Sequence, residues 1–326
     1  MKFALLSRPR TQAILNGKFK LDGLPIHWHA ITDPLNWLPA SAERDRGTLS
    51  GGFDGGEMSI SSFIRAKAHE APLLALPIFL KRGLAQRSLF CSFDSQFVSP
   101  EQLSGARIGL VGYTSSMAVW MRGVLAEEYK LSRTSPIWCA LTSPPSTTEA
   151  KIQVRQIPEQ FLPEEIAAWE ELDGYSHRLD RREAFLMYLL ERGELDAVIS
   201  FQTRIASKKV RPLVTADDII WSHYRNRGVY PINHLFVMRE DVFSEFPEIG
   251  ETLLAAFREA RKLWVDYLPD EREQIQREIE HLGCDPFAYR LKKVDRRTLE
   301  VFIGYLLGEK MIPEKLSVDK LFHQKK

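Results

Sequence analysis

The candidates for proton transfer in this sequence are the side chains of His234 and Glu57. His234 follows a Pro-Ile turn, and histidine is the side chain whose pKa begins near neutral pH. Glu57 could orient the histidine, accept a proton, or act as the acid if burial raises its pKa. The alternatives are a packed histidine and a carboxylate that the dipole of the following helix favours. We predict that His234 and Glu57 are catalytic residues.

Short hydroxyl residues mark two predicted helix starts. Free backbone N–H groups and the helix dipole make such a start favourable for an anion. The predicted substrate-binding residues there are Ser59 and Ser61 in one helix and Thr114, Ser115 and Ser116 in the other. A ligand with two adjacent carboxylates could be held by both groups. Ordinary helix capping by Ser and Thr is the alternative for each.

Two arginines flank the end of a predicted strand. Arg82 and Arg87 lie where α/β sheets usually place ligand contacts, and a guanidinium pairs with a carboxylate through two parallel hydrogen bonds. We therefore predict both as substrate-binding residues, with a surface ion pair as the alternative. Arg122 is a weaker candidate, because it lies one helical turn past the helix start.

A pair of histidines lies on one face of a predicted strand. His27 and His29 are two residues apart, a spacing that can chelate a metal if Glu57 or His234 supplies a third ligand. A partly exposed strand face is the alternative. We predict no cofactor, and a divalent metal at this pair is the option that the sequence leaves open.

The composition excludes several functional classes. The 326 residues carry 44 Lys and Arg against 43 Asp and Glu, so the net charge of +1 gives no electrostatic basis for nonspecific binding to nucleic acid or an anionic membrane. Three separated cysteines lack CxxC spacing, which argues against disulfides. The apolar run at residues 3–6 is too short for a secretory signal, so we expect a cytoplasmic protein.

Strand-like and helix-like segments alternate along the chain, and this alternation predicts a mostly parallel sheet flanked by helices. The length exceeds what one hydrophobic core usually supports, which predicts two lobes. A turn-rich crossing is predicted at residues 93–105, and an acidic helix at 164–173. Apolar residues at steps of three or four from residue 253 onward predict a helical C-terminal region.

Five motifs occur in the same order as in a known family. They are FDGGEMSISS at 53–62, LPIF at 76–79 followed by Arg82, GARIG at 105–109, YTSSMAVWMRG at 113–123 and GVYPINH at 228–234. Together they resemble the 4,5-dihydroxyphthalate decarboxylase family. That family is similar in fold to type 2 periplasmic solute-binding proteins, which have two α/β lobes and a ligand cleft between them. The resemblance implies a first lobe of residues 1–95 and 230–326 and a second of 96–229.

The resemblance implies a decarboxylase of a hydroxylated aromatic (di)carboxylic acid. Protonation of the ring carbon that carries the carboxylate would be followed by loss of CO2, with a small anionic aromatic substrate as the partner. The alternative is a solute-binding protein or cytosolic sensor for such an anion. Gln86-Arg87-Ser88 replaces a frequent Arg-His-Ser, Gly112 replaces Glu, and Asn233 replaces Met. These departures leave the exact substrate open. Association into a homo-oligomer is a separate option that the sequence leaves open.

Overall fold

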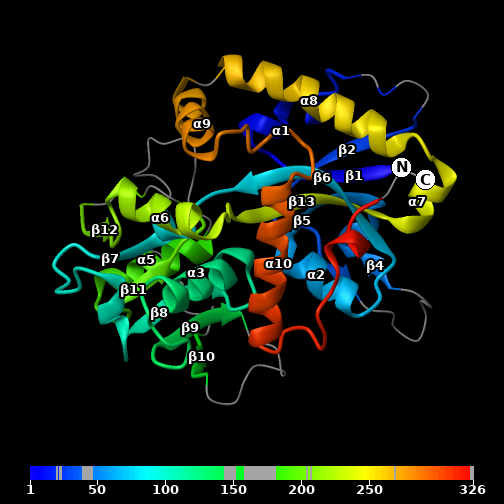
Figure 1. Ribbon diagram of the computed structural model, residues 1–326. Helices are drawn as coiled ribbons and strands as arrows, with labels where there is room; N and C mark the ends of the chain where they lie inside the picture. Colours follow the sequence, from blue (N-terminus) through cyan, green and yellow to red (C-terminus); the bar gives the residue numbers. More distant parts are fainter. Residues whose placement is uncertain are drawn as a thin grey trace. The chain divides into compact units, whose positions relative to one another are not determined.

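The computed structural model describes residues 1–19, 21, 24–38, 47–142, 152–157, 181–202, 205, 208–267 and 269–323 (Figure 1). The helix predicted at 164–173 lies outside these residues. The chain divides into two compact units. The first unit comprises Met1–Gly83, Ile232–Ile303 and Glu314–Lys326, and the second comprises Leu84–Pro231 and Gly304–Pro313.

The first unit is built on a five-stranded sheet. In spatial order its strands are β2 (His27–Ile31), β1 (Lys2–Leu6), β5 (Gly55–Ser59), β13 (Ile232–Arg239) and β6 (Leu73–Arg82). The first three run parallel, and β13 is antiparallel to both β5 and β6. The return strand β13 is thus inserted between β5 and β6, which brings residues near 234 beside residues near 57.

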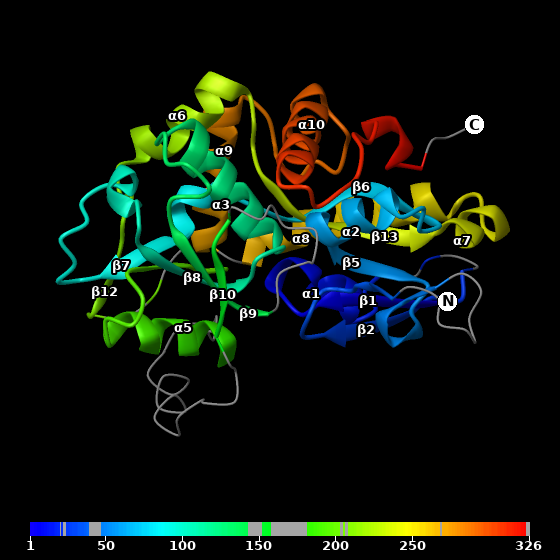
Figure 2. The ribbon, with the colours of Figure 1, turned by 90° about the horizontal axis from the view of Figure 1, so that it is seen from below.

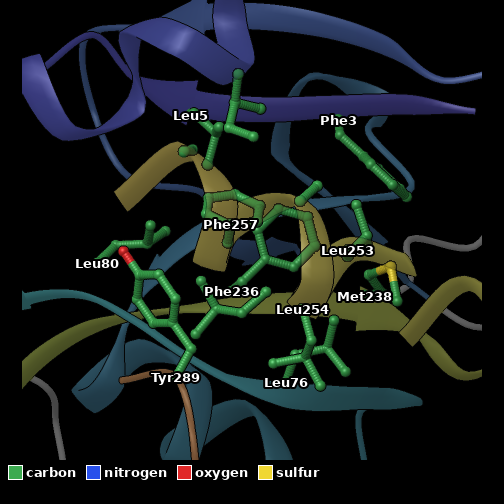
Figure 3. Packing of buried hydrophobic residues seen from close by; sticks show 14 of the residues in the cluster. Phe3, Leu5, Leu76, Leu80, Phe236, Met238, Leu253, Leu254, Phe257 and Tyr289 are labelled. Carbon is green, nitrogen blue, oxygen red and sulfur yellow. The ribbon is translucent and has the colours of Figure 1, made fainter. Parts of the chain in front are cut away.

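Helices cover the sheet of the first unit because each presents an apolar stripe to it. Helix α1 (Pro9–Leu15) packs against β1, β2 and α8 (Ile249–Tyr267), and α2 (Ile60–Ala68) packs against β5 and β13. The apolar spacing from residue 253 onward predicted a helix there, and α8 confirms this prediction. Figure 3 shows the core formed by this stripe and the sheet, where Phe3 is edge-on to Phe236 and Phe236 is tilted against Phe257. Helix α9 (Pro269–Leu282) follows α8.

The second unit contains a six-stranded sheet. Its strands are β10 (Val154–Gln156), β9 (Ile137–Thr142), β8 (Arg107–Gly112), β11 (Ala197–Ile199), β7 (Leu89–Ser92) and β12 (Val210–Pro212). The first four are parallel, so their carboxyl ends meet at one edge, and β7 is antiparallel to β11 and β12. The described helices of this unit include α3 (Ser116–Glu127), α5 (Arg181–Glu191) and α6 (Asp217–Arg227), and Figure 2 shows α3 and α5 on opposite faces of the sheet.

The boundaries between the units differ from those inferred from the sequence. Strand β7 was expected within residues 1–95 of the first lobe, but it pairs with β11 and β12 in the second sheet. Strands β6 and β7 are close together in sequence, as the two strands of a hairpin are. However, the chain passes from the first unit to the second at Gly83, which lies between them. Residues 304–313 also belong to the second unit, because helix α10 (Lys293–Gly308) begins in the first and ends in the second.

A buried ion pair attaches the C-terminal segment to the second unit. Arg122 on α3 donates through Nη2 to Glu309 Oε2 at 2.7 Å, and both side chains are fully buried. The guanidinium also lies over the Tyr113 ring, 3.8 Å from its centroid. Arg122 therefore has a structural role, since removing either partner would leave a buried charge unpaired.

Packing beside this ion pair gives a test of the fold. A methyl group at Gly123 would overlap the Tyr305 ring, so we expect Gly123→Ala to destabilise the second unit by about 1–3 kcal/mol. The matched control is Gly304→Ala, where no described residue lies within 4 Å of an added Cβ; it should be neutral or stabilising by up to about 1 kcal/mol. Urea unfolding of the three proteins measures both effects. Equal midpoints for the two variants would contradict the described packing.

Candidate functional site

The carboxylate of Glu57 is the centre of a polar cluster in the first unit. Glu57 lies on β5 with a fully buried side chain. Its Oε1 accepts from Arg8 Nη1 at 2.7 Å and bonds His234 Nδ1 at 2.6 Å, while Oε2 accepts from the backbone N–H of Leu6 at 3.3 Å. We call Arg8, Glu57 and His234 the Glu57 cluster. Two residues predicted as catalytic are therefore in direct contact.

The sheet topology explains why these residues meet. Arg8 follows β1, and Glu57 is the middle residue of β5, which is parallel to β1. His234 is the third residue of the antiparallel strand β13, where it is in register with Ser59, the last residue of β5. The cluster therefore forms at the edge where parallel strands end, the usual location of ligand sites in α/β sheets.

The protonation states follow from the neighbours of each group. Burial alone raises the pKa of Glu57, but the charge of Arg8 and the hydrogen bond and charge of His234 together outweigh it and lower this pKa to about 2. Burial lowers the pKa of His234 to about 4, and the charges of Arg8 and Lys81 act in the same direction against the raising effect of Glu57. At neutral pH the cluster thus holds a carboxylate, a guanidinium and a neutral imidazole.

The tautomer of His234 follows from the same contacts. A carboxylate has no proton to give, so the 2.6 Å contact requires that Nδ1 carries the hydrogen and donates it to Glu57. The Nε2 atom then has a lone pair, and no described residue hydrogen-bonds to it. The side chain of His234 is 13% exposed.

Two residues of this region escaped the sequence analysis. Arg8 lies two residues after the end of a strand, and this position is the one signal that could have marked it as a site residue. Its side chain is 25% exposed. Asn233 is 2% exposed, and neither atom of its amide has a hydrogen-bond partner among the described residues. It had been noted only as a departure from the family motif.

The other predicted residues of the first unit have structural partners. Arg82 is buried and donates to Asp295 at 2.7 Å and to the carbonyl of Pro286 at 3.0 Å. Ser59 caps α2 by accepting from the N–H of Ser62 at 3.2 Å, and Ser61 is fully buried in the first turn of that helix. Arg82 is thus not part of the Glu57 cluster.

The predicted residues of the second unit lie around the start of α3 and at a nearby turn. Ser115 caps α3 by accepting from the N–H of Ala118 at 3.3 Å, with Thr114 before it and the buried Ser116 after it. Arg87 pairs with Asp217 at 3.1 Å, and its side chain is 27% exposed. Ser115 therefore acts as a helix cap, and Arg87 takes part in a surface ion pair. These are the alternatives to substrate binding that the sequence left open for the two residues.

The predicted histidine pair lies on the edge strand β2. His27 and His29 are both exposed, and the His29 ring is tilted against the Phe53 ring with centroids 5.4 Å apart. Glu57 and His234, the suggested third ligands, bond instead to one another. Among the described residues, no three His, Cys, Asp or Glu side chains form a group that could hold a metal ion. None of the described helices is long and apolar enough to cross a membrane.

Comparison with known structures defines the fold. The periplasmic aliphatic sulphonate binding protein SsuA of Escherichia coli matches 100% of this chain and 92% of its own, with a TM-score of 0.59 and 13% identity. The desulfurization enzyme DszB matches 99% and 96%, with a TM-score of 0.52 and 14% identity. The chain has the two-lobed α/β fold of periplasmic-binding-protein-like proteins, a fold found in both binding proteins and an enzyme.

Sequence comparison finds two similar proteins of one name. The chain is 23% identical over 340 residues to a 4,5-dihydroxyphthalate decarboxylase of Comamonas testosteroni, which covers 99% of this chain and 96% of that protein. It is 27% identical over 192 residues to a 4,5-dihydroxyphthalate decarboxylase of Pseudomonas putida, covering 58% and 66%. No protein-family model matches the chain. The similarity is distant and extends over the whole length.

The protonation states of the Glu57 cluster predict acid sensitivity. Unfolded histidine binds a proton below about pH 6.5, whereas folded His234 does so only near pH 4, so stability is lost as the pH falls through that window. Glu57 adds a further loss between its ordinary pKa of 4.5 and about 2. We expect His234→Gln to remove a pH-dependent loss on the order of 1–3 kcal/mol between pH 6.5 and 4.5. Urea unfolding at several pH values measures it.

The exposed His69 supplies the matched control, since His69→Gln should retain the pH dependence of the unsubstituted protein. If His234→Gln lost as much stability on acidification as the unsubstituted protein, folded His234 would not have a lowered pKa.

Proposed function

We propose that the protein decarboxylates a hydroxylated aromatic (di)carboxylic acid, with His234 moving the proton. The observation that carries this proposal is the direct bond between buried Glu57 and the imidazole of His234, with Arg8 on the same carboxylate. The arrangement combines a fixed cation with a proton carrier whose Nε2 has no described partner. Similarity to two proteins named 4,5-dihydroxyphthalate decarboxylase supports the substrate class.

The chemistry requires one proton and yields one molecule of CO2. A hydroxyl group para to the carboxylate makes the carboxylate-bearing ring carbon electron-rich, and protonated His234 gives its Nε2 proton to that carbon. The bond from this carbon to the carboxylate then breaks, CO2 leaves, and its bonding electrons restore the aromatic ring. The histidine, neutral again, takes its next proton from solvent.

Arg8 and Glu57 determine when His234 can act as the acid. In the protein without ligand the imidazole is neutral, because burial and the charges of Arg8 and Lys81 disfavour the cation. A substrate carboxylate beside Arg8 would offset the positive charge and raise the pKa of His234 toward neutral pH. Glu57 stabilises the imidazolium and fixes the ring orientation through Nδ1. Arg8 takes the substrate-binding role that the sequence suggested for Arg82.

A solute-binding protein or sensor is the second candidate, and the fold it shares with sulphonate-binding proteins favours it. It requires recognition of the same class of anion without a reaction. The two candidates differ in one observable, since a binding protein returns its ligand unchanged.

Turnover tests the proposal directly. We expect the purified protein to release CO2 from 4,5-dihydroxyphthalate or a related catechol acid, and His234→Gln to lower kcat by at least about 100-fold because the proton donor is lost. Ligand binding by the variant, followed by calorimetry, should change little. His69→Gln, an exposed histidine, should retain full turnover. Tight binding with no CO2 from any of these acids would favour the solute-binding alternative.

The pKa of His234 provides a test that does not need turnover. Between pH 5 and 8 the ring signal of His234 should not titrate in the protein alone, because its pKa is about 4. Saturation with phthalate, which carries the carboxylates without hydroxyls, should bring a titration into this range. The signal is measured by NMR and assigned by its loss in His234→Gln, with neutral benzamide as the control ligand. A flat response with phthalate bound would show that its charge does not act on His234.

A further inference from the structure

Two buried polar side chains in the second unit have no hydrogen-bond partner among the described residues. Gln86 is 1% exposed and Ser88 is fully buried. No described residue hydrogen-bonds to either amide atom of Gln86 or to Oγ of Ser88. Buried polar groups are nearly always paired, since leaving one unpaired is unfavourable. Two such residues in one short turn indicate a place where a ligand supplies the missing partners.

The turn that carries these side chains packs against helix α3. Residues Ala85–Ser88 form a short 3₁₀ helix, in which successive side chains are about 120° apart. Arg87 points outward, where it pairs with Asp217. Gln86 and Ser88 therefore point away from the Arg87 side, and the turn packs against α3.

The turn lies at the edge of the sheet where parallel strands end. Leu89 is in register with Ile199 on β11, which is in register with Leu110 on β8, and the carbonyl of Ser88 accepts from the N–H of Ser200 at 2.9 Å. The chain leaves β8 at this edge and begins α3. The first-turn N–H groups and positive dipole end of α3 consequently face the same edge as Gln86 and Ser88.

We propose that this edge is a subsite for the vicinal dihydroxy group of an aromatic ligand. A carboxamide has a donor and an acceptor side by side. Gln86 Oε1 would accept from one catechol hydroxyl, while Nε2 donates to the neighbouring oxygen, and Ser88 Oγ supplies a further bond. The start of α3 favours negative charge on that oxygen. This inference rests on the proposed function only for the identity of the ligand as a catechol acid.

The enclosure of these atoms determines the kind of selectivity. A site built around hydrogen bonds to a hydroxyl discriminates strongly against a ligand that lacks it, because the buried groups then remain unpaired. Because both amide atoms are enclosed, the side chains around them must move when a ligand binds. The subsite should therefore discriminate between ligands by their hydroxyl groups, not by their total charge.

The decisive variant is Gln86→Leu, which removes both amide atoms and keeps a similar volume. We expect its melting temperature without ligand to equal or exceed that of the parent protein, because no protein hydrogen bond is lost. Its affinity for 4,5-dihydroxyphthalate should fall at least about 10-fold, whereas its affinity for phthalate should change less than about threefold. If Gln86 had only a structural role, Gln86→Leu would lower the melting temperature and leave the ratio of the two affinities unchanged.

Both affinities are measured by calorimetry in the His234→Gln background, so that no turnover consumes the ligand. Gln153→Leu, an exposed glutamine of the second unit, is the matched control and should change neither affinity. An unchanged affinity ratio in Gln86→Leu would overturn the subsite even if the parent protein releases CO2. A changed ratio without CO2 release by the parent protein would support the subsite and contradict the decarboxylase. If neither ligand binds, the subsite is also overturned.

Discussion

The buried carboxylate of Glu57 is the constraint on which the candidate site depends. An ionised carboxylate removed from water is tolerated only when cations and hydrogen-bond donors surround it. Here Arg8, His234 and the N–H of Leu6 meet this need, and they come from the first strand and from a strand more than 200 residues later in the chain. The register of β1, β5 and β13 must therefore be correct before the charge can be buried. In this sense the polar cluster and the sheet specify one another.

The same electrostatics connect structure to the proposed chemistry. A histidine that was already protonated in the protein alone would bind anions, but its protonation state would not change when they bind. Burial and two neighbouring cations keep His234 neutral, while its bond to Glu57 leaves the imidazolium accessible once negative charge arrives. If the imidazolium of His234 forms only beside an anionic ligand, it is present when the ring carbon that accepts its proton is in place. Control of this kind needs no movement of the backbone.

The sequence predicted the elements with periodic signals and missed the contacts that depend on tertiary structure. Hydrophobic spacing predicted α8, and motif order predicted the fold and the pair of Glu57 with His234 as catalytic candidates. Arg8 carries no periodic or motif signal, because its role arises from the parallel pairing of β1 with β5. The partner of Arg82 is Asp295, 213 residues away, and no local pattern encodes that pair. Strand β7 was assigned to the wrong lobe because hydrophobicity does not distinguish between two sheets.

The Glu57 cluster and the turn that carries Gln86 and Ser88 differ in how far their polar groups are satisfied, and this difference separates affinity from selectivity. In the Glu57 cluster the cation of Arg8 is paired with the carboxylate of Glu57, and the proposed response of neutral His234 is to the charge of a ligand, whichever anion carries it. Gln86 and Ser88 are neutral and lack partners among the described residues, so they gain only from a ligand that offers matching donors and acceptors. Long-range charge steers any anion, whereas neutral buried groups reject those that leave them unpaired. A protein that must choose a catechol acid among many aromatic anions needs the second kind of group, because charge alone cannot distinguish them.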